Sequence, residues 1–192
     1  MACRLWQEVT KDGLDMTGMI GDLTAATSLL ADGSKPEAPS EQAKLKQAEQ
    51  AMKAKFRAEF EGATSPAKQV ELANLLLERS RRIKGNPELR FVMLREATDQ
   101  AAAAGKATVA CAAVDQLARY FAFDEMAMKV AAIEQAAKKV RGSQAYRETT
   151  EEILKVVEQA VANGQVADAK KLTPIAAALA KKSANIDRKS TR

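Results

Sequence analysis

Histidine is absent from this 192-residue chain, and cysteine and aromatic residues are scarce. Without histidine the chain lacks the commonest metal ligand and the usual general base near neutral pH. Aromatic residues make up 4% of the sequence, which is too few for folds that stack nucleic-acid bases on rings. The missing residue types therefore argue against most metal, hydrolytic and base-stacking sites.

The two cysteines, Cys3 and Cys111, lie 108 positions apart. No CxxC pair exists, which excludes a thioredoxin-type site and a zinc ribbon, and two cysteines cannot form a disulfide framework. Cys111 falls on an apolar helical face with Ala107, Val114 and Ala118. We interpret it as a small buried apolar side chain.

Motifs of common enzymes and nucleotide-binding sites are also missing. The sequence contains no GxSxG, GxxxxGK[ST] or GxGxxG pattern. Close pairs of acids do occur, but neighbouring residues on a helix point about 100° apart and do not face each other. These pairs are Glu59 and Glu61, Asp124 and Glu125, and Glu151 and Glu152. We assign no residue to catalysis, cofactor binding or metal binding, and we expect the chain not to be an enzyme.

Long apolar runs are absent too. None approaches the roughly 18 residues that a membrane span needs, and early acidic residues interrupt any secretory signal. Taken as given, the sequence predicts a cytoplasmic protein. The alternative is the cell envelope or secretion, if the start of the chain is incomplete.

Charge divides the chain near residue 42. Residues 1–42 carry a net charge of −4, whereas residues 43–192 carry +9. Residues 32–40 combine two prolines, a glycine and small polar residues, which is typical of a linker. We therefore predict a leader over 1–40, a helical domain over 41–183 and a basic tail over 184–192. The leader contains one short amphipathic pattern, formed by Met16, Met19, Ile20, Leu23 and Leu30.

Glycines punctuate the helical domain at regular intervals. Five of them, Gly62, Gly85, Gly105, Gly142 and Gly164, each follow a segment with helical spacing of apolar residues. Ser65-Pro66 and Asn86-Pro87 place a capping residue before a proline, and Asp124 and Ser143 can cap the segments that follow them. No segment alternates with period two, so no sheet is expected.

These signals predict an all-α domain of six to seven antiparallel helices. The predicted helices cover 41–61, 66–84, 87–104, 107–121, 125–140, 144–163 and 166–182. Pro174 is expected to kink or split the last one. Short connections favour either tetratricopeptide-like helical hairpins or an irregular bundle.

An internal similarity supports the hairpin alternative. Residues 93–118 align with residues 152–177 at an offset of 59. Five small residues, Ala101, Ala103, Gly105, Ala110 and Ala118, match Ala160, Ala162, Gly164, Ala169 and Ala177. Small residues around a tight glycine turn let two helices pack closely. The full tetratricopeptide signature of Trp, Tyr and Pro positions is absent.

Basic residues gather at the predicted helix ends. The run 79–84 contains Arg79, Arg81, Arg82 and Lys84, and we interpret it as the last turn of a helix, where cations complement the dipole. The alternative is a phosphate-binding patch. The same interpretation applies to two later groups of basic residues. The first is Lys138, Lys139 and Arg141, and the second is Lys181 and Lys182.

Two further arginines, Arg90 and Arg95, flank an apolar stretch. We interpret them as partners of interhelical ion pairs, with Asp115 of the neighbouring helix as a candidate. A ligand-binding role is the alternative.

One family resemblance covers residues 56 to about 139, under half of the chain. The sequence NPELRFVMLREA at 86–97, together with AAG at 103–105, AVDQL at 113–117 and FAFD at 121–124, carries it. This stretch resembles an all-helical region of large planctomycete-type bacterial proteins, where it lies beside other modules in envelope or secreted proteins. The resemblance implies an α-helical spacer or interaction segment of unknown function, not an enzyme.

We therefore expect a non-enzymatic helical module that serves as a spacer or binds protein, either a second copy or another partner. No cofactor or small-molecule substrate is implied. The alternative is a nucleic-acid-associated helical protein, motivated by the pI of 9.2 and the basic body. A carboxylate enzyme would need two acids that share a pocket and have raised pKa values.

Overall fold

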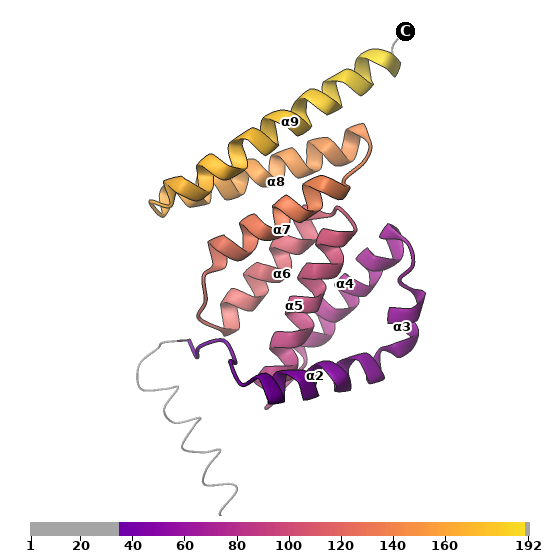
Figure 1. Ribbon diagram of the computed structural model, residues 1–192, viewed down its shortest axis with the longest axis vertical. Coiled ribbons are helices and arrows are strands. Elements are labelled where there is room, and N and C mark those ends of the chain that lie inside the picture. Colours follow the sequence, from indigo (N-terminus) through magenta and orange to yellow (C-terminus); the bar gives the residue numbers. More distant parts are fainter. Residues whose placement is uncertain (1–34, 191–192) are drawn as a thin grey trace, which may run out of the picture. The chain divides into compact units, whose positions relative to one another are not determined.

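The computed structural model describes residues 35–190, and the side chains of residues 35–186. Within this range the regular elements are helices, and the single extended pairing is a parallel bridge between Glu37 and Ala122. The helices are α2 (Gln42–Lys55), α3 (Arg57–Gly62), α4 (Pro66–Arg81), α5 (Pro87–Ala103), α6 (Ala107–Tyr120), α7 (Glu125–Lys139), α8 (Ser143–Ala162) and α9 (Val166–Ser190) (Figure 1). The all-α prediction is confirmed. The predicted leader helix and Cys3 lie outside the described residues.

Local signals set three of the helix starts, those of α4, α5 and α7. Ser65, Asn86 and Asp124 each accept a hydrogen bond from the backbone N–H three residues later, as N-caps do. Pro66 and Pro87 occupy the first helical positions. The prediction for Ser143 is wrong by one position: the N-cap of α8 is residue 142, and the serine is the first residue of that helix.

Glycine follows four of the described helices as predicted. Gly85, Gly105, Gly142 and Gly164 follow α4, α5, α7 and α8 with φ between 72° and 94°, a conformation that glycine adopts without strain. Gly62 differs because it is the last residue of α3 and has no positive φ.

Two helix predictions need adjustment. The helix predicted over 41–61 is two helices, because Phe56 leaves the helical conformation (φ −110°, ψ 29°) while its ring is buried in the core. The helix predicted over 166–182 is not split at Pro174 and continues to Ser190. Pro174 and Lys170 are both exposed, so water can satisfy the carbonyl that the missing proline N–H leaves free. Lys181 and Lys182 therefore lie within α9, not at its end.

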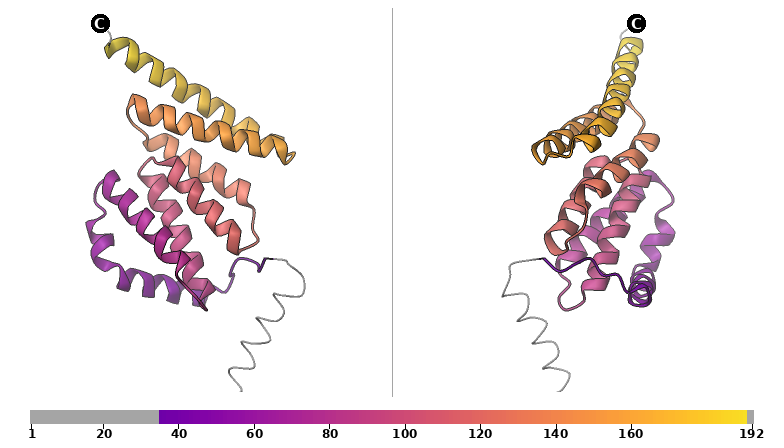
Figure 2. Two further views of the ribbon diagram at one scale, coloured as in Figure 1. Left: turned by 180° about the vertical axis from the view of Figure 1, so that it is seen from behind. Right: turned by 60° about the vertical axis from the view of Figure 1, so that its left-hand side comes forward.

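The helices form two layers. Each helix from α4 onward contacts the next helix along the chain. Contacts also join α4 with α6 and α6 with α8 in one layer, and α5 with α7 and α7 with α9 in the other. Helix α2 lies beside α5. Figures 1 and 2 show the resulting stack, which ends with the α8–α9 pair.

The core consists of two adjoining clusters of buried side chains. The first fills the space between α2, α4, α5 and α6, and includes an edge-to-face pair of the Phe91 and Phe121 rings, 5.5 Å apart. The second lies among α6, α7, α8 and α9, around Ile133, Ile153 and Leu172. Helix α6 supplies residues to both clusters, so it joins the two halves of the stack.

The hairpins α5–α6 and α8–α9 match each other at the 59-residue offset. Their turns carry equivalent hydrogen bonds: Gly105 N–H donates to Ala102 and Lys106 N–H to Ala101, while Gly164 N–H donates to Val161 and Gln165 N–H to Ala160. The buried positions also match. Leu94, Ala97, Ala101, Ala110, Ala113 and Leu117 are buried, and so are Ile153, Val156, Ala160, Ala169, Leu172 and Ala176. The two hairpins therefore share one turn geometry and the same six buried positions where their two helices pack together.

Candidate functional site

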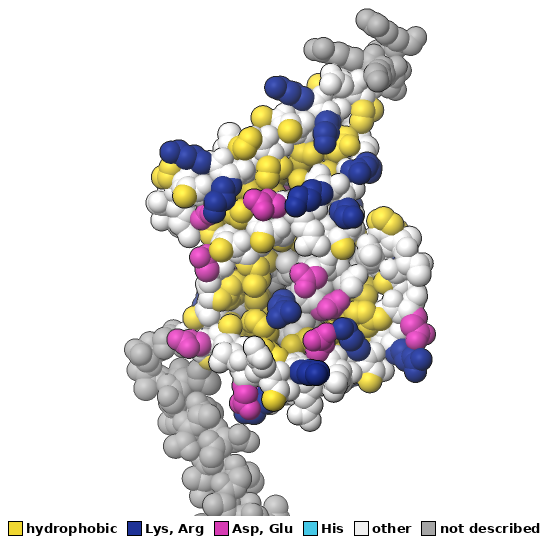
Figure 3. Space-filling model, in the orientation of Figure 1, with side chains coloured by type: hydrophobic (Ala, Val, Ile, Leu, Met, Phe, Trp, Pro, Cys, Tyr) yellow, Lys and Arg dark blue, Asp and Glu magenta, His cyan; other side chains and the backbone are white. Residues whose placement is uncertain are grey.

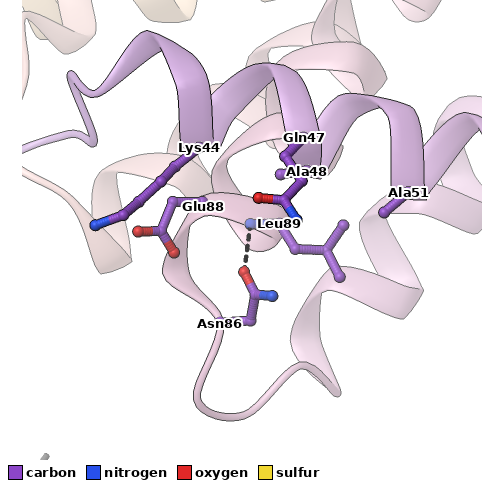
Figure 4. Close-up of a pocket in the computed structure, with 7 residues that line it drawn as sticks. All are labelled: Lys44, Gln47, Ala48, Ala51, Asn86, Glu88 and Leu89. Atoms are coloured by element: carbon purple, nitrogen blue, oxygen red, sulfur yellow. Dashed lines mark hydrogen bonds between the residues drawn. The ribbon is translucent and has the colours of Figure 1, made fainter.

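A shallow hollow of about 410 Å³ lies between α2 and the start of α5. Figure 4 shows its lining, in which the Asn86 side chain accepts a hydrogen bond from Leu89 N–H at 2.8 Å. Lys44 pairs with Glu41 at 2.8 Å, an exposed local pair. Asn86 thus caps α5, and Lys44 pairs with a residue outside the lining.

The basic run at the end of α4 has mostly structural partners. Arg79 and Arg81 lie in its last turn, which confirms their place at a helix C-terminus. Arg81 Nε donates to the Gln116 side chain at 2.9 Å, and Arg82 pairs with Glu78 at 2.6 Å. Arg79 lines a hollow of about 230 Å³ together with Lys55 and Arg82.

The acid pairs of the sequence are divided among separate local contacts. Glu61 pairs with Arg57 at 2.7 Å and Glu152 with Lys155 at 3.4 Å. Asp124 caps α7, whereas Glu125 turns toward Lys129. The members of a pair therefore do not converge on a shared site.

The predicted pair between Arg90 and Asp115 is wrong. Arg90 donates to the backbone carbonyls of Ser80 and Ile83 at the end of α4, where the last carbonyls of a helix need partners. Its guanidinium lies 4.2 Å from the centre of the Tyr120 ring. Asp115 instead binds Lys129.

Lys129 is the buried centre of a polar cluster that the sequence did not predict, and its partners Asp115 and Glu125 are partly exposed. Its ammonium lies 2.5 Å from Asp115 of α6 and 2.7 Å from Glu125 of α7, and it donates to Gln159 of α8. Only 3% of the residue is exposed. The sequence indicated one part of this cluster, the pair of Glu125 and Lys129, since residues four apart share a helix face. Asp115 and Gln159 join them only through packing.

The electrostatics of this cluster favour a structural role. Burial alone would lower the pKa of Lys129, but hydrogen bonds and charge interactions with Asp115 and Glu125 outweigh it and raise the pKa. A permanently charged lysine is a poor nucleophile or base. The cluster therefore ties α6, α7 and α8 together.

Two further titratable groups have shifted pKa values. Cys111 is 1% exposed, which confirms it as a buried side chain, and burial raises its pKa to about 12. The thiol is thus protonated and unreactive at neutral pH. Burial and the nearby Glu96 raise the pKa of Asp99.

Neither a metal site nor a membrane span is found in the part of the chain that the structure describes. Among residues 35–190, no three Cys, Asp or Glu side chains are placed to hold a metal ion. No helix in this range has the length and apolar character needed to cross a membrane.

Exposed apolar side chains gather on the last hairpin. The four large apolar side chains that the described residues expose all lie on α8 or α9: Leu154 (50%), Val161 (57%), Val166 (49%) and Ile186 (40%). Apolar surface over this pair is visible in Figure 3, beside several lysines and arginines. Scattered exposed apolar residues are ordinary, but a cluster on one element indicates a contact surface.

Three of these residues, Leu154, Val161 and Val166, belong to one face, which we name the outer face. Gln159 of α8 contacts α7, and at about 100° per residue it points about 140° away from Leu154, so the outer face turns away from α7. The outer face is defined by residues at helical spacing on α8 and α9: Thr150, Leu154, Val157 and Val161, and Val166, Lys170, Thr173, Ala177, Ala180 and Ala184.

The corresponding face of α5–α6 is covered over most of its length. Fifty-nine residues earlier, Val157, Val161, Val166 and Thr173 correspond to Thr98, Ala102, Ala107 and Val114, and all four of those residues are buried. Helix α7 packs on both α5 and α6. The exception is the counterpart of Leu154, Arg95, which is exposed.

The turns of the two hairpins show the same difference. A Cβ atom on Gly105 would lie 2.8 Å from Val140 N, just after α7. A Cβ atom on Gly164 would meet nothing within 4 Å. The outer face of α8–α9 is thus the surface that α7 covers in the earlier hairpin.

Comparisons of the chain with protein-family models, curated proteins and solved structures return no match. No partner-binding residue was predicted from the sequence. The alignment at an offset of 59 residues contained a sign of the exposed face, because it places valine at 161 and 166 where α5–α6 has alanine.

Proposed function

We propose that this chain is a non-enzymatic module of tetratricopeptide-like helical hairpins that binds protein through the outer face of α8–α9. One observation carries the proposal: the face exposes Val161 and Val166 at positions whose counterparts in α5–α6 are buried beneath a packed helix. Leu154 extends the apolar area along α8. Burying apolar area of this kind is the main favourable contribution to helix docking.

The layered packing supports the same proposal. In helical-repeat proteins each unit contacts only its neighbours, and α8–α9 has one face that no helix among residues 35–190 covers. The resemblance of residues 56–139 to a helical spacer or interaction region of planctomycete-type proteins agrees with a binding role. No cofactor or small-molecule substrate is part of the proposal.

A site-specific photo-crosslink tests this function. A benzophenone amino acid is placed at Val161 on the outer face, and as a matched control at Ala67, an exposed position on α4. Irradiation of cells that express the chain should give discrete crosslinked proteins, of this chain or of another, from position 161 only. Equal or absent crosslinking at the two positions contradicts the proposal.

A second candidate function is nucleic-acid association. It is favoured by the net +9 of residues 43–192 and by the three basic residues around the hollow at Arg79. Such binding should be tight at about 50 mM salt and should weaken steeply by about 500 mM. Fluorescence anisotropy with mixed oligonucleotides measures it, and the variant Arg79→Glu should weaken it further. Salt-independent or absent binding removes this candidate.

A further inference from the structure

We infer that a second copy of this chain occupies the outer face. The two copies pair about a twofold axis parallel to α8 and α9, so that α8 of each copy lies over α9 of the other. This inference rests on the proposed function and names its partner. Three features of the outer face support it: its spacing, the sizes of its side chains and its charges.

The spacing suits a seam between helices. On α9 the face contains residues 166, 170, 173, 177, 180 and 184, and on α8 residues 150, 154, 157 and 161. Both sets alternate steps of four and three, the spacing at which packed helices keep one face toward a partner. Two such helices side by side form half of a four-helix bundle. A second copy supplies the other half.

The side-chain sizes are complementary between α8 and α9. Helix α8 contributes the exposed Leu154 and Val161 and the half-buried Val157, whereas α9 contributes Val166 and Lys170 near the turn and smaller residues, from Thr173 to Ala184, farther along. Residue 154 precedes the turn residue 164 by ten positions and residue 173 follows it by nine, so the two lie at similar heights in the antiparallel hairpin. Placing α8 over α9 of the second copy therefore sets Leu154 against the smaller Thr173 and Val161 against Val166, each twice in the assembly.

The charges are complementary in the same arrangement. Glu158 lies six residues before Gly164 and Lys170 six residues after it, on the outer face or at its border. Both are exposed, and neither forms an ion pair with any described residue. Pairing α8 with α9 of the second copy places Glu158 beside Lys170 of that copy, and the symmetry produces the contact twice.

The described part of the chain does not supply a covering helix of its own. The helix that covers the first hairpin is α7. It begins at Glu125, after the non-helical residues 121–124 that follow α6. The equivalent position in the second hairpin, 59 residues later, is Ala184. There α9 continues without a turn to Ser190. The surface that α7 covers in the first hairpin thus stays open in the second within residues 35–190.

Charge reversal in the full chain tests the pairing. Wild-type protein should reach twice the monomer mass in sedimentation velocity as its concentration rises. Glu158→Lys or Lys170→Glu alone replaces two attractive contacts with two repulsive ones, and each should weaken dimerisation by at least about tenfold. Mixing the two variants should restore a mixed dimer, because the two substituted side chains then meet across the axis with opposite charges. Lys84→Glu, at an exposed residue between α4 and α5, is the control with the same charge change.

The outcomes separate this inference from the proposed function. A wild-type chain that stays monomeric, a dimer that neither variant weakens, or a mass that keeps rising beyond a dimer overturns the twofold pairing. If position 161 then crosslinks to a different protein, the interaction function stands and the second copy is the wrong occupant. If position 161 captures nothing, both proposals fail. Val161→Glu gives a second way to break the dimer, and circular dichroism checks that each variant is folded.

Discussion

The hairpins α5–α6 and α8–α9 form the same turn and share six buried positions, yet their surroundings differ. Helix α7 covers one face of α5–α6, whereas no helix among the described residues 35–190 covers the matching face of α8–α9. The residues follow this difference: the covered face has Ala102 and Ala107, and the open face has Val161 and Val166. Small residues permit the close approach of α7, and larger apolar residues on an open surface leave area for a partner to bury.

The largest expected difference comes from placing a charge at matched positions. Ala102→Glu should destabilise the fold by about 4 kcal/mol or more, because the carboxylate is buried beneath α7 without a partner. Val161→Glu, 59 residues later, should change the free energy of unfolding of the monomer by less than about 0.5 kcal/mol. Urea unfolding at low protein concentration measures both. Equal losses would show that the two faces are buried alike.

A smaller difference is expected from the two turn glycines. Gly105→Ala should cost about 3 kcal/mol, since alanine is strained at φ 75° and its Cβ would lie 2.8 Å from Val140 N. Gly164→Ala has the same backbone strain but free space, and should cost about 1 kcal/mol. Thermal and urea unfolding check the ranking. A reversed order would refute the close contact of the first turn with the end of α7.

Thiol reactivity compares a third matched pair. In a Cys3→Ser background, Cys111 should react with a thiol reagent at least about a hundredfold more slowly than an exposed cysteine, because it is buried and its pKa is about 12. Cys111→Ala combined with Lys170→Cys moves the thiol to the equivalent position of α9, where it should react rapidly. Absorbance of the released thiolate follows both rates. Similar rates would mean that α7 does not protect position 111.

The smallest expected difference in stability between a variant and its control concerns the link that α7 makes between the hairpins. Lys129→Ala should cost about 2 kcal/mol, because it leaves the carboxylates of Asp115 and Glu125 without their buried partner. The control is Lys171→Ala, which removes an exposed ion pair with Asp168 and should have a much smaller effect. Urea unfolding compares the two. A loss for Lys129→Ala no larger than that of the control would show that the cluster is dispensable.

The pH dependence gives a second measure of the same link. Contacts with Asp115 and Glu125 raise the pKa of Lys129 above its ordinary value of 10.5. Its stabilising effect is therefore complete below pH 10.5 and is lost as the pH rises through the folded-state pKa. The difference in stability between wild type and Lys129→Ala should narrow above pH 10.5, and a difference that widens there would contradict the assignment.

Local signals predicted the helices well because they act over a few residues. Ser65-Pro66, Asn86-Pro87 and Asp124 begin helices as expected, and four of the five punctuating glycines follow helices with positive φ. The failures involve contacts between distant residues. Burial of the Phe56 ring accompanies a break in a helix that spacing made continuous, and Arg90 binds carbonyls of α4 instead of Asp115.

The candidate site was only partly accessible from sequence. The alignment at an offset of 59 residues identified the matching hairpins but could not show which of their faces is covered. Val166 has the helical spacing of Ala169 and Ala176, which are buried, and yet it is exposed. Val166 is exposed because α7 packs against the side of α8 and α9 that is opposite to the outer face.

The helical class, the turn positions and the match between the two hairpins follow from the amino-acid sequence, because capping, glycine conformation and apolar spacing are local properties. Which helix faces meet depends on the three-dimensional packing. The Lys129 cluster and the open face of α8–α9 both depend on how α7 is placed, since packing brings together side chains that no local pattern relates.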